Sequence, residues 1–180
     1  MTYRLDSDIY LGYGSFINKT TNQIIKPDYF FNFDEENHVV RNLTEFGLTE
    51  LVGRTKDIAW LVSHCDTIIK REVYVKEMKK YKGLQIDIYG GCGNESLTIP
   101  KKSEGGWEIG YPMLGKNYKF YLAFENSKCL DYITEKFFTA LKAGMIPVVM
   151  GGLSKKDYEK IAPPHSYLHV QCHQFDIAQF

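Results

Sequence analysis

From residue 58 onward, apolar runs of strand length alternate with segments of helical pattern. The run at 58–63 is apolar up to its terminal serine, which is typical of a strand buried on both faces of a parallel sheet, and 118–124 is expected to be another strand. Strands that alternate with helices at this spacing predict an α/β fold, a parallel sheet with helices on both faces. Further strands are expected over 85–89, 146–150 and 167–170, helices over 70–81, 132–143 and 155–161, and a loop from 90 to about 117.

The chain changes character near residue 50. Residues 11–50 mix glycine, asparagine and short aromatic clusters, a composition that favours loops and short strands. A length of 180 residues suffices for one sizeable core. We therefore divide the chain into an irregular segment, 1–52, and a regular α/β domain, 53–180.

Charge and hydropathy exclude some classes of partner. The 22 basic and 22 acidic residues cancel, which argues against a protein that neutralises nucleic acid or an anionic membrane. The sequence contains no apolar run of the roughly 18 to 20 residues that a membrane-spanning helix needs. Three candidate glycosylation sequons indicate a secretory setting, with chance occurrence as the alternative, and begin at Asn18, Asn42 and Asn94.

Four cysteines are present, and none is spaced with histidine in a zinc-binding pattern. We therefore predict no metal site. The sequence leaves open whether these cysteines are free thiols or form two disulfides; they are Cys65, Cys92, Cys129 and Cys172.

The strand-to-helix junction after 118–124 carries a candidate binding set. Asp131 is a reasonable N-cap, and a helix beginning at Tyr132 would project Tyr132, Glu135 and Lys136 away from its apolar face. Lys136 could neutralise a diphosphate, Glu135 could accept hydrogen bonds from hydroxyls, and Tyr132 could pack on a ring. This set suits a nucleotide sugar, and the alternative is an ordinary solvated helix face.

A second junction contains His64-Cys65-x5-Arg71, the spacing of cysteine-dependent phosphatases. The five residues between Cys65 and Arg71 include two isoleucines, an aspartate and no glycine, which is poor material for a loop of inward-pointing N–H groups. The better functional interpretation uses Arg71 alone as a bidentate diphosphate ligand. The alternative for Arg71 is a surface ion pair.

Several motifs closely resemble the donor-binding signature of the α1,3/4-fucosyltransferases. The most specific is Tyr-Lys-Phe-Tyr-Leu-Ala-Phe-Glu-Asn-Ser at 118–127, which precedes Asp-Tyr-Ile-Thr-Glu-Lys at 131–136 and Ile-Pro-Val-Val at 146–149. Stretches within 1–8, 55–72 and 87–90 resemble the same family. The matching stretches occur in family order up to about residue 170, and residues 15–50 match poorly.

The resemblance implies the GT-B type of fold, with two facing Rossmann-like domains. Residues 53–180 would be the domain that binds GDP-fucose, and 1–52 the end of the acceptor domain with a variable linking segment. The implied activity is an α1,3-fucosyltransferase that transfers L-fucose, with inversion, to an N-acetylglucosamine hydroxyl of an N-glycan or lactosamine. No cofactor is implied, and stimulation by a divalent metal is left open.

The resemblance also assigns a donor site by motif. Two cations would hold the diphosphate, a serine would lie near the phosphates, polar side chains would bind ribose or fucose hydroxyls, and tyrosines would line the pocket. In that order the residues are Arg71 and Lys136, Ser63, Glu135 and Asn126, then Tyr132, Tyr121 and Tyr89, with Glu125 in the same set.

The sequence begins at the family's Tyr-Arg-x-Asp-Ser-Asp motif. The general base and most of the acceptor domain are expected upstream of Met1, so we expect this chain to be the donor part of a longer Golgi membrane enzyme that faces the lumen. Two alternatives are an inactive nucleotide-sugar-binding fragment and a cysteine-dependent phosphatase that uses Cys65 and Arg71.

Overall fold

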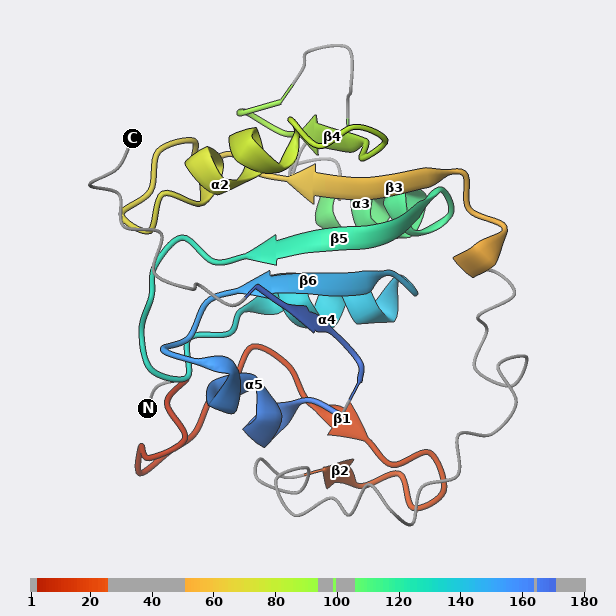
Figure 1. Ribbon diagram of the computed structural model, residues 1–180. Coiled ribbons are helices and arrows are strands. Elements are labelled where there is room, and N and C mark those ends of the chain that lie inside the picture. Colours follow the sequence, from red (N-terminus) through yellow and green to blue (C-terminus); the bar gives the residue numbers. More distant parts are fainter. Residues whose placement is uncertain (1–2, 26–50, 94–98, 100–105, 164, 171–180) are drawn as a thin grey trace.

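A computed structural model describes residues 3–25, 51–93, 99, 106–163 and 165–170. Its centre is a five-stranded sheet in the order β4-β3-β5-β6-β7, and every neighbouring pair of strands is parallel (Figure 1). The strands are β3 (Lys56–Leu61), β4 (Ile86–Tyr89), β5 (Tyr118–Phe124), β6 (Ile146–Met150) and β7 (Leu168–His169).

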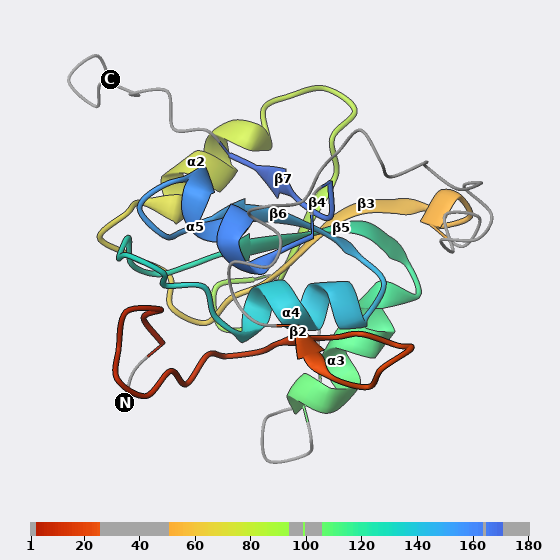
Figure 2. The ribbon, with the colours of Figure 1, turned by 90° about the horizontal axis from the view of Figure 1, so that it is seen from below.

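Helices cover both faces of this sheet, which confirms the predicted α/β class (Figure 2). Along β5, Tyr121 and Ala123 enter one buried cluster, whereas Leu122 and Phe124 enter another on the opposite face. This alternation explains why the carboxyl-terminal part of β5, residues 120–124, is apolar without interruption, since each successive side chain packs on one face or the other. The helices are α2 (Arg71–Met78), α3 (Gly106–Gly115), α4 (Glu135–Lys142) and α5 (Lys155–Ile161).

The described part of the amino-terminal segment lies against α4. Its strands β1 (Phe16–Ile17) and β2 (Ile24–Ile25) pair antiparallel, as the expectation of short strands within 11–50 implied. The Phe16 ring lies 5.9 Å from that of Phe138 and 6.5 Å from that of Phe137, both on α4. Aromatic packing therefore joins this segment to the α/β core. No helix among the described residues has the length and apolar character to cross a bilayer.

Two expectations about the helices were wrong. The helix expected from Tyr132 begins at Glu135, because Asp131 adopts a left-handed φ of 56° and Thr134 takes the N-cap position. The expected loop from 90 to about 117 contains α3, despite Pro112 inside it. Tyr111 and Leu114 of α3 are almost fully buried in the core, and this packing overrides the low helix propensity of proline and glycine.

Candidate functional site

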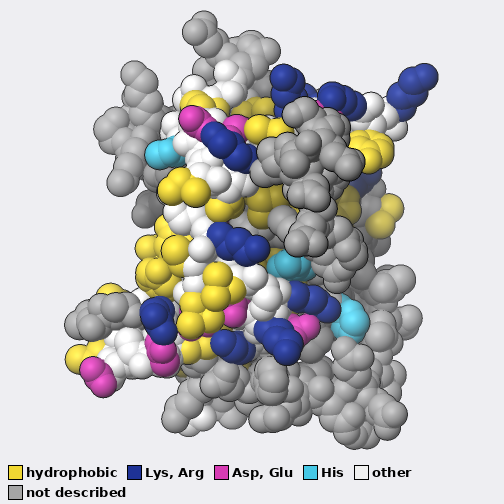
Figure 3. All heavy atoms as spheres, turned by 60° about the vertical axis from the view of Figure 1, so that its left-hand side comes forward, with side chains coloured by type: hydrophobic (Ala, Val, Ile, Leu, Met, Phe, Trp, Pro, Cys, Tyr) yellow, Lys and Arg dark blue, Asp and Glu magenta, His cyan; other side chains and the backbone are white. Residues whose placement is uncertain are grey.

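The strand order places a topological switch point at the carboxyl ends of β3 and β5, and we call this edge of the sheet the crevice. The chain leaves β3 for α2 on one face of the sheet and leaves β5 for α4 on the other face. The loops after these strands therefore diverge, and in open parallel sheets ligands bind at such a switch point. Figure 3 shows the molecule turned toward this edge, where basic side chains gather among hydrophobic ones.

Arg71, the first residue of α2, joins the two sides of the crevice. Its side chain is only 4% exposed and donates hydrogen bonds to the backbone carbonyls of Phe124 and of His64, the latter at 3.1 Å. The guanidinium carbon lies 5.6 Å from the ring centre of Trp60. Burial lowers the pKa of Arg71, and within the described residues no carboxylate forms an ion pair with it. The surface ion pair considered for Arg71 is therefore wrong.

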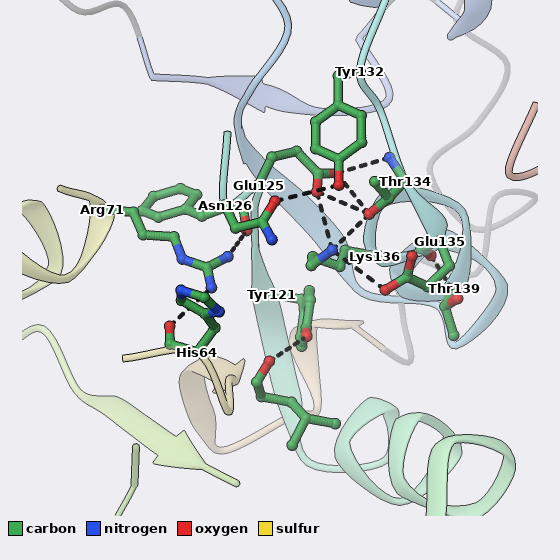
Figure 4. Close-up of polar contacts among 12 residues, drawn as sticks. His64, Arg71, Tyr121, Glu125, Asn126, Tyr132, Thr134, Glu135, Lys136 and Thr139 are labelled. Carbon is green, nitrogen blue, oxygen red and sulfur yellow. Dashed lines mark hydrogen bonds and ion pairs between the residues drawn. The ribbon is translucent and has the colours of Figure 1, made fainter. Parts of the chain in front are cut away.

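On the other side of the crevice, Glu125 and Lys136 form an ion pair with 3.0 Å between carboxylate oxygen and ammonium (Figure 4). Glu125 has no exposed surface and also accepts hydrogen bonds from the backbone N–H and the hydroxyl of Thr134, at 2.8 and 2.9 Å. Burial raises the pKa of Glu125, and the neighbouring Lys136 opposes that shift. Lys136 lies 3.3 Å from Glu135 as well, so two carboxylates surround its ammonium.

Tyr132 lies in the loop before α4, not on the helix. Its hydroxyl donates to Oδ1 of Asn126 at 3.3 Å, and burial raises its pKa to about 12. The ring also contacts two tyrosines that the sequence reasoning missed, with centroid distances of 5.1 Å to Tyr3 and 6.4 Å to Tyr13. The position of Tyr3 inside the Tyr-Arg-x-Asp-Ser-Asp motif was the available signal.

The three remaining expected site residues do not lie together, because one is exposed and two are buried in the core. Ser63 is exposed at the end of β3, and its hydroxyl oxygen accepts from the backbone N–H of Gly91 at 3.4 Å. Tyr121 is completely buried with its hydroxyl 3.0 Å from that of Tyr111, and Tyr89 is 6% exposed. Both expected pocket tyrosines are core side chains here, because they point into the sheet face covered by α3 and α4.

A disulfide joins the loop after β3 to the loop after β4. Cys65 and Cys92 are bonded, with their Cα atoms 5.3 Å apart, while Cys129 is an exposed free thiol. Of the two open alternatives, the described cysteines thus show one disulfide and one thiol, and Cys172 lies outside the described residues. The phosphatase interpretation is wrong, since a disulfide-bonded Cys65 has no thiolate to act as nucleophile.

One of the three candidate glycosylation asparagines lies among the described residues. Asn18 is exposed in the turn between β1 and β2, and its side-chain oxygen accepts from the backbone N–H of Thr20 at 2.9 Å. Asn42 and Asn94 lie outside the described residues. Across the described ranges, no three histidine, cysteine or acidic side chains group as a metal site.

The molecule also has a cavity of about 1080 Å³ between α3 and α4. Arg54, Lys142 and Glu135 are among its lining residues, and Glu135 also contacts Lys136. Arg71 and Lys136 instead contact Phe124 and Glu125, which directly precede Asn126, and none of Arg71, Asn126 and Lys136 lines the cavity.

Comparisons with known proteins identify the family of the chain. The family model "Glycosyltransferase family 10 (fucosyltransferase) C-term" matches residues 51–179. Alpha-(1,3)-fucosyltransferase C of Drosophila melanogaster is 41% identical over 93% of this chain and 36% of its own length. Alpha-(1,3)-fucosyltransferase 4 of Homo sapiens is 33% identical over 94% of this chain and 27% of its own length. The chain thus spans about a third of these relatives.

Solved structures resemble this one in fold. A crystal structure of an alpha1,3-fucosyltransferase superposes with a TM-score of 0.51 at 22% identity, over 67% of this chain and 31% of that one. An alpha1,3-fucosyltransferase crystallised with GDP-fucose also gives 0.51 at 20% identity, over 71% of this chain and 33% of that one.

Proposed function

Since the chain belongs to the fucosyltransferases of glycosyltransferase family 10, we propose that its α/β domain binds GDP-fucose at the carboxyl ends of β3 and β5. We propose further that it takes part in the inverting α1,3 transfer of L-fucose to an N-acetylglucosamine hydroxyl of an N-glycan or lactosamine. One observation carries the proposal: Arg71 at the start of α2 and Lys136 in the first turn of α4 contact adjacent residues at the end of β5, Phe124 and Glu125.

The chemistry needs positive charge beside the departing diphosphate. When the bond between the fucose anomeric carbon and the diphosphate oxygen breaks, its electron pair stays on GDP, and a nearby cation stabilises that charge. The acceptor oxygen attacks from the opposite face and loses its proton to a carboxylate base. Arg71 suits the first role, because its charge is bonded to neutral carbonyls and has no carboxylate ion pair among the described residues.

Lys136 contributes differently because Glu125 and Glu135 already balance its charge. Glu125 is completely buried and so acts on a ligand only by positioning Lys136 and the start of α4. Glu135, with a side chain 43% exposed, and Asn126 are available for ribose or fucose hydroxyls. Ser63 is exposed near the expected phosphates.

A lumenal Golgi setting is part of the proposal, with the parent enzyme anchored in the membrane. Disulfides persist in the oxidising secretory pathway, which fits the bond between Cys65 and Cys92. The exposed turn at Asn18 fits an N-glycosylated protein, since such sequons occupy surface loops.

Calorimetric titration with GDP, GDP-fucose and GDP-mannose tests the donor site. We expect Arg71→Ala and Lys136→Ala each to weaken GDP binding by roughly tenfold or more, since hydrogen bonds to charged groups contribute about 1.5 to 3 kcal/mol. Lys76→Ala, an exposed lysine on α2, is the matched control. Absence of GDP binding by the folded wild-type chain would refute the proposal, and unchanged affinity in both variants would place the diphosphate elsewhere.

Transfer needs its own measurement. Incubation with GDP-fucose and N-acetyllactosamine should yield a fucosylated product detectable by mass spectrometry. Binding of GDP-fucose without product would support the second candidate, a domain that binds the nucleotide sugar without transferring fucose.

A further inference from the structure

Three tyrosines from two distant parts of the chain form an aromatic cluster beside the crevice. Tyr3 and Tyr132 pack edge to face with ring centroids 5.1 Å apart, and the Tyr13 ring lies 6.4 Å from each of them. Tyr13 is 48% exposed, and both Tyr3 and Tyr132 are partly exposed. Edge-to-face contacts leave ring faces available for another flat partner.

Asp131 holds Tyr3 in this position. Its carboxylate accepts a hydrogen bond from the backbone N–H of Leu5 at 3.1 Å and lies 3.3 Å from the ammonium of Lys160. Its own backbone N–H donates to Asp157 at 3.3 Å. The residue is in the left-handed conformation directly before Tyr132, so it fixes the course of both segments that carry the first two rings.

Tight packing next to Tyr13 holds the third ring. A Cβ atom added at Gly14 would approach the Phe138 ring to 2.4 Å, so only glycine lets the backbone lie this close to α4. The Phe16 ring then packs on the same helix. The exposed ring of Tyr13 is therefore next to a backbone segment that packs closely against α4.

The cluster is continuous with the candidate donor site. The hydroxyl of Tyr132 donates to Asn126, which follows β5 at the switch point beside Glu125. Exposed aromatic rings next to polar side chains are the usual means by which proteins bind a flat, partly apolar ring carrying polar groups.

We propose that Tyr3 and Tyr13 are binding residues of the donor site, where together with Tyr132 they stack on a ring of the nucleotide sugar. This inference rests on the proposed function and adds an amino-terminal wall to the site. The shared chemistry is a ring face that packs on an aromatic ring: the nucleobase supplies a flat one, and the puckered ring of fucose supplies a face of C–H groups.

Titration of the full chain with GDP and with GDP-fucose tests the inference. We expect Tyr3→Ala and Tyr13→Ala each to weaken binding at least fivefold, since an aromatic ring stacked on a base is worth about that much. Tyr3→Phe should bind like the wild type because it keeps the ring. Tyr81→Ala, a 72% exposed tyrosine just beyond α2, is the control and should change nothing.

Comparison of GDP with GDP-fucose shows whether the tyrosine cluster contacts the nucleobase or the fucose. Loss of affinity for both GDP and GDP-fucose assigns the cluster to the nucleobase, and loss for GDP-fucose alone assigns it to the sugar. Wild-type affinity in both alanine variants, or equal losses in Tyr3→Phe and Tyr3→Ala, would overturn the inference while the proposed function stood. A wild-type chain that binds neither ligand would remove the proposed function and this inference with it.

Discussion

The carboxylate of Glu125 lies 3.0 Å from the ammonium of Lys136, at the point where β5 passes into the loop before α4. The acid has no exposed surface, whereas 18% of the lysine side chain is exposed. The same carboxylate accepts the backbone N–H of Thr134, the N-cap residue of α4. One buried acid therefore fixes both a candidate ligand residue and the helix that carries it.

Replacing Glu125 should lower the free energy of unfolding more than replacing an acid of an exposed ion pair. We expect Glu125→Ala to lower the free energy of unfolding by roughly 3 kcal/mol, because Lys136 and the Thr134 N–H lose their buried partner. Glu125→Gln should cost clearly less, since an amide oxygen still accepts from Thr134. Urea unfolding measures both, with Glu77→Ala at the exposed pair to Lys80 as control. Equal losses for Ala and Gln would contradict this account.

Arg71→Lys should destabilise the chain even though it keeps the charge. One ammonium cannot match the guanidinium that contacts the Phe124 and His64 carbonyls and packs over Trp60, so we expect a loss of roughly 2 kcal/mol. Arg4→Lys, the same change in an exposed pair, should leave the free energy of unfolding unchanged. Denaturant titration of both variants gives the comparison, and similar values would argue against a structural role for Arg71.

Removal of the Cys65–Cys92 disulfide should destabilise the crevice loops. The bond closes a loop with a sequence separation of 27, for which loop-closure entropy predicts about 3.5 kcal/mol. Thermal unfolding of the Cys65→Ser, Cys92→Ser double variant measures this loss. Cys129→Ser, at an exposed thiol, should unfold like the wild type. Two reactive thiols at Cys65 and Cys92 in the native, unreduced protein would show that the bond is absent.

Asp87 should make part of the stability depend on acid. Burial raises its pKa, but hydrogen bonds from Tyr118 and Lys56 outweigh that effect and bring the pKa below the usual value. A lowered folded-state pKa stabilises the native chain above the unfolded value of about 3.9, and this contribution disappears as the pH falls through the folded pKa. We expect Asp87→Asn to cost roughly 1.5 kcal/mol at pH 7 and progressively less below pH 4. A difference in unfolding free energy that stays constant from pH 7 to pH 3 would exclude this contribution.

The succession of strands and most helices along the chain could be predicted from the sequence because mainly apolar strand segments alternate with segments of helical pattern. β5 matches its expected bounds, and α5 does as well. The start of α4 could not be predicted in this way. Asp131 looked like a cap, but its carboxylate bonds to Leu5, 126 residues away, and its backbone turns left-handed.

A diphosphate and sugar site was likewise predicted from motif and helical spacing, and its ligand roles stay a prediction. The environments of its residues could not be predicted, because burial depends on contacts between distant segments. Tyr121 and Tyr89 point into the core, and Arg71 and Lys136 take their partners from other elements of the fold. Cys65 met the spacing of a nucleophile, yet Cys92 on the neighbouring strand's loop bonds to it.

The sequence alone determined the α/β class and the residue types at the strand ends, since both follow from local pattern and periodicity. Only the tertiary structure decided which of those side chains share one crevice, which are buried, and which amino-terminal tyrosines join them. The physical reason is that local pattern specifies the face on which a side chain lies, whereas its partners and its exposure depend on how distant segments pack together.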